Sequence, residues 1–220
     1  QNKEWVWGYR ESDALGGDDP YSSSKACAEL ITSAYRHSYF KKPQFPFKDV
    51  SLATARAGNV IGGGDWAKDR LIPDIMESLL NNKQLAVRNA TSIRPWQFVM
   101  EPLCGYLALV EKLWNDGTKY AENWNFGPKD DEYQPVCWIV ERLGVLWGTK
   151  VGWEEIPKSY PHETNYLRLD CSKSNQKLNW SPKLDINTTL KWVVAWYKSY
   201  SNNEDMEEIT KNQIKEYQSL

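Results

Sequence analysis

Two consecutive segments decide the fold: Val50-Ser51-Leu52-Ala53-Thr54-Ala55-Arg56-Ala57 and Gly58-Asn59-Val60-Ile61-Gly62-Gly63-Gly64-Asp65. The first is a short apolar run with β-branched members, which is typical of a buried strand in a parallel sheet. The second leaves that strand as a glycine-rich loop, whose three consecutive glycines would let the backbone approach a ligand closely. Ligands of α/β folds bind beyond the carboxyl ends of the strands, so this loop marks the expected binding edge.

Helices and strands are predicted to alternate on both sides of these segments. Apolar spacing and end signals predict helices at 20–40, 71–81, 102–115, 135–147, 170–178, 186–201 and within 203–220. Strands are predicted at 85–88, 121–126 and 151–156, and loops at 1–19 and around Arg94-Pro95-Trp96. Such alternation indicates an α/β architecture.

The helix predicted at 20–40 begins with a candidate acid/base pair. Asp19 and Pro20 are typical of a helix start, and Tyr21 and Lys25 follow them. Because these two residues are four apart, they lie on one face of the helix, one turn from each other. A cation beside the ring favours the phenolate, which suits a tyrosine that exchanges protons with a substrate. The alternative is an ordinary helix start that happens to contain both residue types.

Composition argues against several classes of function. The net charge of −2 and the lack of any Lys/Arg block give no surface for nucleic acid. No apolar run has membrane-spanning length and no signal peptide is evident, so we expect a cytoplasmic protein without a membrane partner. Four cysteines in no C-x-x-C pair and two histidines suggest neither disulfides nor a metal site.

Two further features concern the limits of the chain and its aromatic residues. The sequence begins at Gln1 without an initiator methionine, and we expect it to be the C-terminal portion of a longer protein. Most of the twelve tryptophans should serve packing. Trp66 and Trp96 could instead stack on a nucleobase, although packing is the simpler interpretation of each.

Six motifs resemble those of the extended short-chain dehydrogenase/reductase family, in its order and spacing, to about residue 198. They are Pro20-Tyr21-x-x-x-Lys25, Arg56-x-x-Asn59-Val60-x-Gly62-x-Gly64-Asp65, Leu71-Ile72-Pro73, Arg94-x-Trp96-x-x-Val99, Trp124-Asn125-Phe126-Gly127 and Asp170-x-Ser172-Lys173. The resemblance implies the C-terminal part of a doubly wound Rossmann-type parallel sheet plus a smaller α/β substrate-binding domain. It assigns 1–62 to the NAD-binding domain and 63–220 mainly to the nucleotide-sugar domain, with short returns to the sheet near 85–126.

A finer resemblance, over 4–11, 57–66 and 94–97, is to family members that dehydrate CDP-glucose. It implies conversion of CDP-D-glucose to CDP-4-keto-6-deoxy-D-glucose, in deoxysugar or surface polysaccharide biosynthesis. Hydride would pass transiently to bound NAD and return to the sugar, so the net reaction is that of a lyase. Tyr21 would be the catalytic base, and Lys25 would hold the cofactor and tune the tyrosine.

The same resemblance implies a set of substrate contacts. They are Asn59, Arg70, Arg94, Asn125, His162 and Tyr166. Arginine suits a diphosphate because its guanidinium fork donates two parallel hydrogen bonds. The competing interpretations are a surface ion pair for Arg94, a turn residue for Asn59 and packing for His162 and Tyr166.

Parts of the family pattern are missing from this chain. No G-x-x-G-x-x-G follows a first strand, so we expect this fragment to be incomplete for NAD binding and activity. Two alternatives stay open: another NAD-dependent nucleotide-sugar dehydratase or epimerase, and a non-catalytic nucleotide-sugar binding module. The family resemblance also implies a homodimer or higher homo-oligomer through the helix at 20–40. The outer face of that helix offers Cys27, Ile31 and Tyr35, which could equally cover the part of the sheet that this chain lacks.

Overall fold

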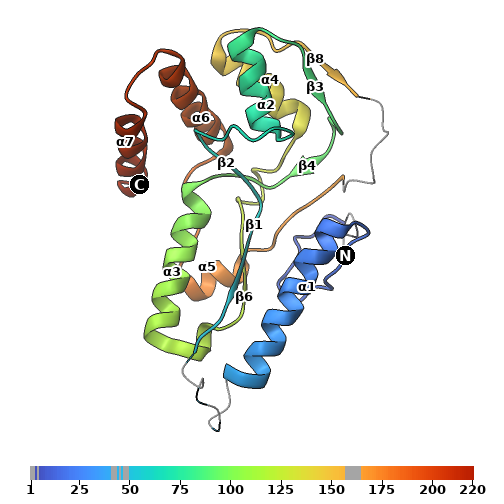
Figure 1. The fold of residues 1–220 in the computed structure, drawn as a ribbon, viewed down its shortest axis with the longest axis vertical. Helices are drawn as coiled ribbons and strands as arrows, with labels where there is room; N and C mark the ends of the chain where they lie inside the picture. The colour runs from blue at the N-terminus through green and yellow to red at the C-terminus, as the bar shows by residue number, and fades with distance from the viewer. Residues whose placement is uncertain (1–2, 4, 41–43, 45, 47–49, 157–164) are drawn as a thin grey trace. The chain divides into compact units, whose positions relative to one another are not determined.

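A computed structural model describes residues 3, 5–40, 44, 46, 50–156 and 165–220, and Figure 1 shows its fold. The chain divides into two compact units. Unit 1 comprises Gln1–Ala57, Pro102–Gly127 and Leu167–Ser181, and unit 2 comprises Gly58–Glu101, Pro128–Tyr166 and Pro182–Leu220. No helix in the described part of the chain is long and apolar enough to cross a membrane.

Two parallel strands form the base of unit 1 within its described residues. β1 (Thr54–Ala57) pairs with β6 (Asn123–Phe126), in a register that runs from Thr54 opposite Asn123 to Ala57 opposite Phe126. The helical elements of this part of the chain are α1 (Pro20–Tyr35), the π-helical turn η1 (Arg36–Phe40), α3 (Met100–Asp116), the 3-10 turn η2 (Gly117–Tyr120) and α5 (Ser172–Leu178). Its apolar core contains Leu109, Tyr120, Trp124, Phe126, Leu178 and Trp180.

Helix α1 begins where the sequence predicts. The Asp19 carboxylate accepts a hydrogen bond from the main-chain N–H of Ser22 at 3.0 Å, and Pro20 occupies the first turn. Hydrogen bonds from the Ser22 hydroxyl and main chain hold the pKa of Asp19 below its ordinary value. The predicted helix at 20–40 is confirmed, although its last turn is π-helical rather than α-helical.

Three strand pairs and four helices make up the part of unit 2 that the structure describes. β2 (Asn59–Ile61) runs parallel to β5 (Trp96–Phe98), β3 (Leu85–Val87) runs parallel to β8 (Trp153–Glu155), and β4 (Ile93–Arg94) runs antiparallel to β7 (Gln134–Pro135). The helices are α2 (Leu71–Asn81), α4 (Val136–Trp147), α6 (Ile186–Ser201) and α7 (Met206–Gln218).

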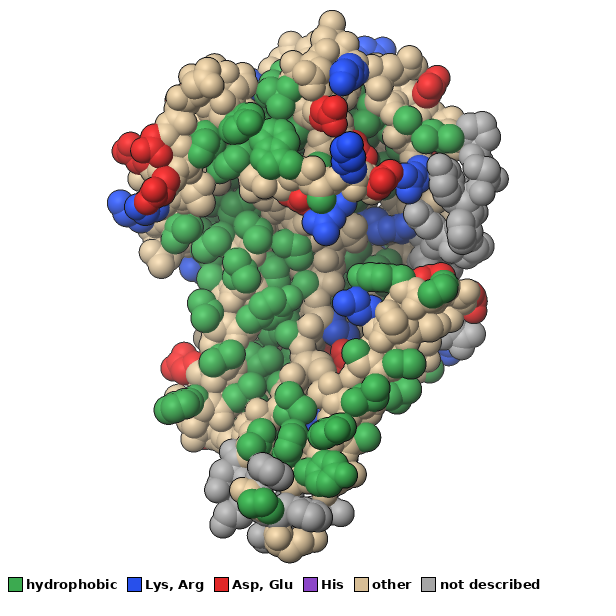
Figure 2. All heavy atoms as spheres, in the orientation of Figure 1, with side chains coloured by type: hydrophobic (Ala, Val, Ile, Leu, Met, Phe, Trp, Pro, Cys, Tyr) green, Lys and Arg blue, Asp and Glu red, His purple; other side chains and the backbone are tan. Residues whose placement is uncertain are grey.

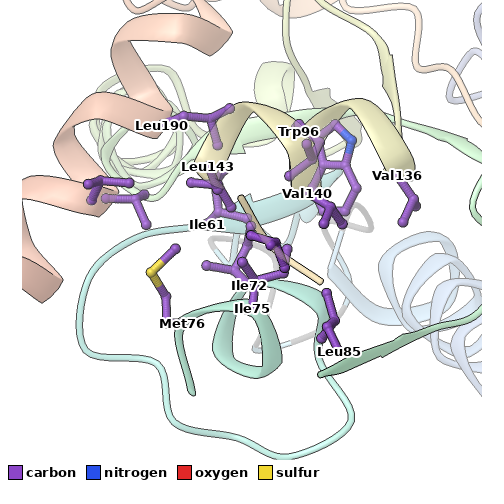
Figure 3. Packing of buried hydrophobic residues seen from close by; sticks show 14 of the residues in the cluster. Ile61, Ile72, Ile75, Met76, Leu85, Trp96, Val136, Val140, Leu143 and Leu190 are labelled. Carbon is purple, nitrogen blue, oxygen red and sulfur yellow. The ribbon is translucent and has the colours of Figure 1, made fainter. Parts of the chain in front are cut away.

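The core of unit 2 is a continuous apolar cluster. Figure 3 shows side chains of α2, α4 and α6 converging with those of neighbouring strands, among them Ile75, Leu143 and Leu190. All three are fully buried. Helix α4 presents Ile139, Val140 and Leu143 to this cluster at the 3.6-residue spacing that predicted the helix.

The loops predicted at 58–65 and around 94–96 are wrong, because both stretches contain strand residues. The Asn59 N–H donates to the Pro95 carbonyl at 2.8 Å, and the Val99 N–H donates to the Ile61 carbonyl at 2.8 Å. These bonds turn residues 59–61 into β2, and β4 and β5 flank Pro95. Pro95 has no N–H to donate, which separates β4 from β5.

The backbone of the glycine-rich loop at 62–64 packs closely against other side chains of the chain. A Cβ on Gly63 would lie 2.1 Å from Cγ of Trp196, and one on Gly62 would lie 2.9 Å from a methyl group of Val99. The prediction that consecutive glycines leave room here for a ligand is therefore wrong for these two positions. They leave room for the α6 indole and for the residue that follows β5.

The predicted domain boundary lies near residue 62, whereas the two compact units divide between residues 57 and 58. The segment predicted to return to the sheet, near 85–126, is longer than the segment that returns to unit 1. Residues 85–101 stay in unit 2 because β3 pairs with β8 and β5 pairs with β2. The chain returns to unit 1 over 102–127, and again over 167–181, which the sequence did not predict.

Candidate active site

Tyr21 and Lys25 lie in the first two turns of α1. Tyr21 is 72% exposed, and Lys25 is exposed beside it. The Lys25 Nζ lies 5.5 Å from the centroid of the Tyr21 ring, so the two groups share one face of the helix, as the spacing predicts. The arrangement offers a hydroxyl and an ammonium to solvent in unit 1, with the cation against the ring.

Three of the predicted substrate residues lie on neighbouring strand segments of unit 2. Asn59 of β2 pairs with Trp96 of β5, and Trp96 follows Arg94 by two residues in the sequence. Tyr166 forms a bridge with Ile93, the neighbour of Arg94, and the Ile93 N–H donates to the carbonyl of residue 165 at 2.8 Å. Asn59, Arg94 and Tyr166 are all partly exposed. The strand pairing therefore places an amide, a guanidinium and a phenol at neighbouring strand positions.

Arg70 stands apart from that group, at the start of α2. Its guanidinium forms an ion pair with Asp65 at 3.1 Å, and its side chain is 67% exposed. The loop that carries Asp65 is fixed from α6, since the Tyr197 hydroxyl donates to the Asp65 carbonyl at 2.5 Å. Burial raises the pKa of Tyr197 to about 12, which keeps this donor protonated.

Asn125 is inside unit 1, in the middle of β6, and is 1% exposed. Its Nδ2 donates to the carbonyls of Tyr9 at 2.9 Å and Asp170 at 3.2 Å, and its main-chain N–H donates to Glu11 at 2.9 Å. These bonds attach two neighbouring segments to the strand. The structure thus gives Asn125 a supporting role, and its contact with a substrate stays a prediction.

The remaining aromatic and histidine predictions divide in three ways. Trp96 is 4% exposed and donates from Nε1 to the Gln134 carbonyl at 2.9 Å, so it serves packing. Trp66 is 45% exposed, yet its ring meets Tyr197 edge-on at 5.0 Å and Tyr200 at 4.8 Å. His162 lies outside the described residues.

One residue near the acid/base pair was not singled out from the sequence. Glu29 lies on α1, four residues after Lys25, and its carboxylate accepts hydrogen bonds from Thr54 and Arg56 of β1. The repeated spacing of four residues from Tyr21 to Lys25 to Glu29 is the signal that could have drawn attention to it.

Comparison with curated proteins gives the chain its relatives. Residues 9–126 match the model of the NAD dependent epimerase/dehydratase family. The chain is 50% identical over 218 residues to CDP-glucose 4,6-dehydratase of Salmonella typhimurium, covering 99% of this chain and 61% of that protein. It is 24% identical to dTDP-glucose 4,6-dehydratase of Haemophilus influenzae, covering 86% of this chain and 54% of that protein. The chain therefore spans little more than half the length of these relatives.

Solved structures share the fold at low sequence identity. The NAD complex of dTDP-glucose 4,6-dehydratase from Bacillus anthracis matches with a TM-score of 0.69 at 22% identity, over 88% of this chain and 56% of that chain. UDP-glucuronic acid 4-epimerase from Bacillus cereus, with UDP-glucuronic acid and NAD, matches with a TM-score of 0.70 at 18% identity, over 90% of this chain and 60% of that chain. The predicted Rossmann-type α/β fold is confirmed, and the chain belongs to the NAD dependent epimerase/dehydratase family.

Proposed function

We propose that the protein containing this chain is a NAD-dependent nucleotide-sugar 4,6-dehydratase whose substrate is CDP-D-glucose. The product is CDP-4-keto-6-deoxy-D-glucose, formed with loss of one water. The observation that carries this proposal is the 50% identity to CDP-glucose 4,6-dehydratase over 99% of the chain. Identity to the dTDP-glucose enzymes is 21–24%, which favours the cytidine nucleotide.

Tyr21 is the proposed acid/base. In its deprotonated form the exposed Tyr21 side chain takes the proton of the sugar 4-hydroxyl, and the Lys25 ammonium lies 5.5 Å from the centroid of its ring. Both groups are hydrogen-bond donors on one helix face, which fits the hydroxyls of a nicotinamide ribose. NAD, when bound, supplies the hydride acceptor and donor that the overall reaction needs.

Unit 2 carries the proposed binding residues for the nucleotide sugar. The Arg94 guanidinium suits the diphosphate, and Asn59 and Tyr166 on the paired strands offer neutral donors and acceptors. Arg70 is a second candidate for the diphosphate because its side chain is 67% exposed, although Asp65 competes for it. The proposed role of these residues is to bind and orient the substrate; none of them takes part in bond making or bond breaking.

This chain alone is proposed to be incomplete. Its sequence lacks a glycine-rich phosphate loop after a first strand, and it covers 61% of the Salmonella relative. We expect the isolated 220-residue chain to bind NAD weakly and to form no product.

The deciding experiment incubates the full-length protein with CDP-glucose, dTDP-glucose and GDP-mannose in separate reactions. The absorbance of a 4-keto sugar in base should appear fastest with CDP-glucose. Fastest product from another nucleotide would reassign the substrate. A 4-epimer without keto product would indicate an epimerase, and recovery of bound but unchanged sugar nucleotide would indicate a binding module.

Compartment and assembly belong to the same proposal. None of the four cysteines, all of them among the described residues, is in a disulfide, which fits a reducing cytoplasm. Figure 2 shows hydrophobic side chains over the region of α1 and α3. Ile31 and Tyr35 on α1 are 58% and 53% exposed, and we propose a homodimer or higher homo-oligomer through this helix. Light scattering of the full-length protein measures its mass, and a monomer would contradict this.

A further inference from the structure

The helix that carries Tyr21 and Lys25 is attached to the sheet by a carboxylate. Glu29 Oε2 accepts a hydrogen bond from the Thr54 hydroxyl at 2.8 Å, and Oε1 accepts one from Arg56 Nε at 2.8 Å. The side chains of Glu29 and Arg56 are only 13% and 21% exposed. Both partners lie on β1, which pairs in parallel with β6 in unit 1.

Apolar packing does little to orient this helix, because α1 contains no buried residue. A second polar attachment lies at its far end. The Arg36 guanidinium donates from Nη1 to the Ala121 carbonyl at 2.7 Å and from Nη2 to the Asn123 side chain at 2.8 Å. Two directional attachments along one helix set both its direction and its rotation about its own axis.

Glu29 is the attachment nearer to the acid/base pair. With a rise of 1.5 Å per residue, Glu29 lies about 6 Å from Lys25 and about 12 Å from Tyr21 along the axis. At 3.6 residues per turn, each step of four residues turns the side chain by about 40°, so Glu29 lies about 80° round the helix from Tyr21. The side of α1 that offers the phenol and the ammonium to solvent is therefore next to the side that is bonded to β1.

We propose that Glu29 is a positioning residue: its bonds to Thr54 and Arg56 fix the rotation and height of α1, and so present Tyr21 and Lys25 in the reactive orientation. The inference rests on the proposed function, in which Tyr21 exchanges protons with the sugar. Its physical basis is the steep dependence of rate on alignment, since a displacement of about 1 Å can cost about a hundredfold. An ion pair that served only stability would leave the rate of the folded enzyme unchanged.

The test is Glu29→Gln in the full-length protein, with Glu111→Gln as the matched control. Glu111 is an exposed glutamate of α3 in the same unit. We expect E29Q to lower kcat at least tenfold while the KM for CDP-glucose stays within threefold. E111Q should leave both constants unchanged.

Thr54→Val is a milder second variant, because it removes one bond to Glu29 and keeps the Arg56 pair. It should lower kcat about threefold, and it decides the question if E29Q does not fold. An unchanged kcat in E29Q, or in T54V where E29Q is unfolded, overturns the inference.

Hydrogen exchange supplies a readout that does not depend on turnover. Amides of α1 should exchange at least tenfold faster in E29Q than in E111Q, and equal rates would overturn the inference. A wild-type protein that forms no 4-keto product would instead overturn the proposed function. The two failures are therefore distinguishable.

Discussion

Helix α1 of unit 1 and helix α4 of unit 2 are held in opposite ways. Helix α1 buries no residue and is attached to its sheet through Glu29 and Arg36. Helix α4 buries Ile139, Val140 and Leu143 completely in an apolar cluster. The candidate acid/base pair is on the helix that depends on polar bonds.

The difference matters because the two kinds of contact act differently. Apolar burial contributes about 25 cal/mol per Å² but has little directional preference. A partly shielded ion pair contributes about 0–1 kcal/mol to stability, yet its geometry is narrow. Changes on α1 should therefore affect the rate more than the free energy of unfolding, and changes on α4 should do the reverse.

The largest expected effect is on the rate, from Tyr21→Phe in the full-length protein. Loss of the hydroxyl should lower kcat by about 10²–10⁴, because no proton acceptor remains at that position. The free energy of unfolding should change by less than about 0.5 kcal/mol, since Tyr21 is 72% exposed. Steady-state assay of 4-keto product and urea unfolding measure the two quantities.

Tyr35→Phe is the matched control for that substitution. Tyr35 lies on the same helix, is 53% exposed, and its ring contacts with Tyr39 and Phe40 would survive. Equal activity in Y21F and Y35F would remove Tyr21 from the reaction and revive the non-catalytic alternative.

The next effect is on stability, from Leu143→Ala in α4. Leu143 is fully buried in the cluster of unit 2, so its truncation should lower the free energy of unfolding by about 2–5 kcal/mol. Val145→Ala on the same helix, at 69% exposed, should cost less than about 0.5 kcal/mol. Denaturant unfolding of the isolated chain measures both. A similar loss in the two variants would contradict the apolar role assigned to α4.

A smaller loss of stability is expected from Gly63→Ala. The added methyl group would lie 2.1 Å from Cγ of Trp196, and making room for it should cost about 1–3 kcal/mol. Gly152→Ala, with no neighbouring atom within 4 Å of the added methyl group, is the control and should be nearly neutral. If G63A unfolds at the same denaturant concentration as G152A, the glycine loop does not pack on α6 as described.

Local patterns explain which elements the sequence could predict. Helices α2 and α6 begin and end at the predicted residues, because their apolar spacing is regular and their ends are clear. Asn82, in the left-handed conformation at φ 50°, ends α2. Strands β2 and β5 have three residues each, too few to show a period, and they form through pairing between Asn59 and Trp96.

The same distinction applies to the candidate site. The relation of Tyr21 to Lys25 is local, so a spacing of four residues was enough to predict that they meet. The partners of Glu29 lie 25 and 27 residues further along the chain, and no local pattern connects them. The burial of Asn125 was missed for a related reason: it depends on three segments that only the fold brings together.

The smallest expected effect tests the polar side of the comparison through pH. Burial works to raise the pKa of Glu29, but hydrogen bonds from Arg56 and Thr54, with the charges of Arg56 and Arg36, lower it below 4.5 overall. A carboxyl whose pKa is lowered by folding stabilises the folded state at pH values above its pKa in the unfolded chain. That contribution is lost as the pH falls through the pKa of the folded state. Wild-type stability should therefore drop more steeply than that of Glu29→Gln below about pH 4.5, by less than about 1 kcal/mol.

Urea unfolding of the isolated chain from pH 6 to pH 3 measures the difference, with Glu111→Gln, an exposed glutamate of α3, as the control. Parallel curves for wild type and E29Q would mean that the bonds to β1 do not hold α1.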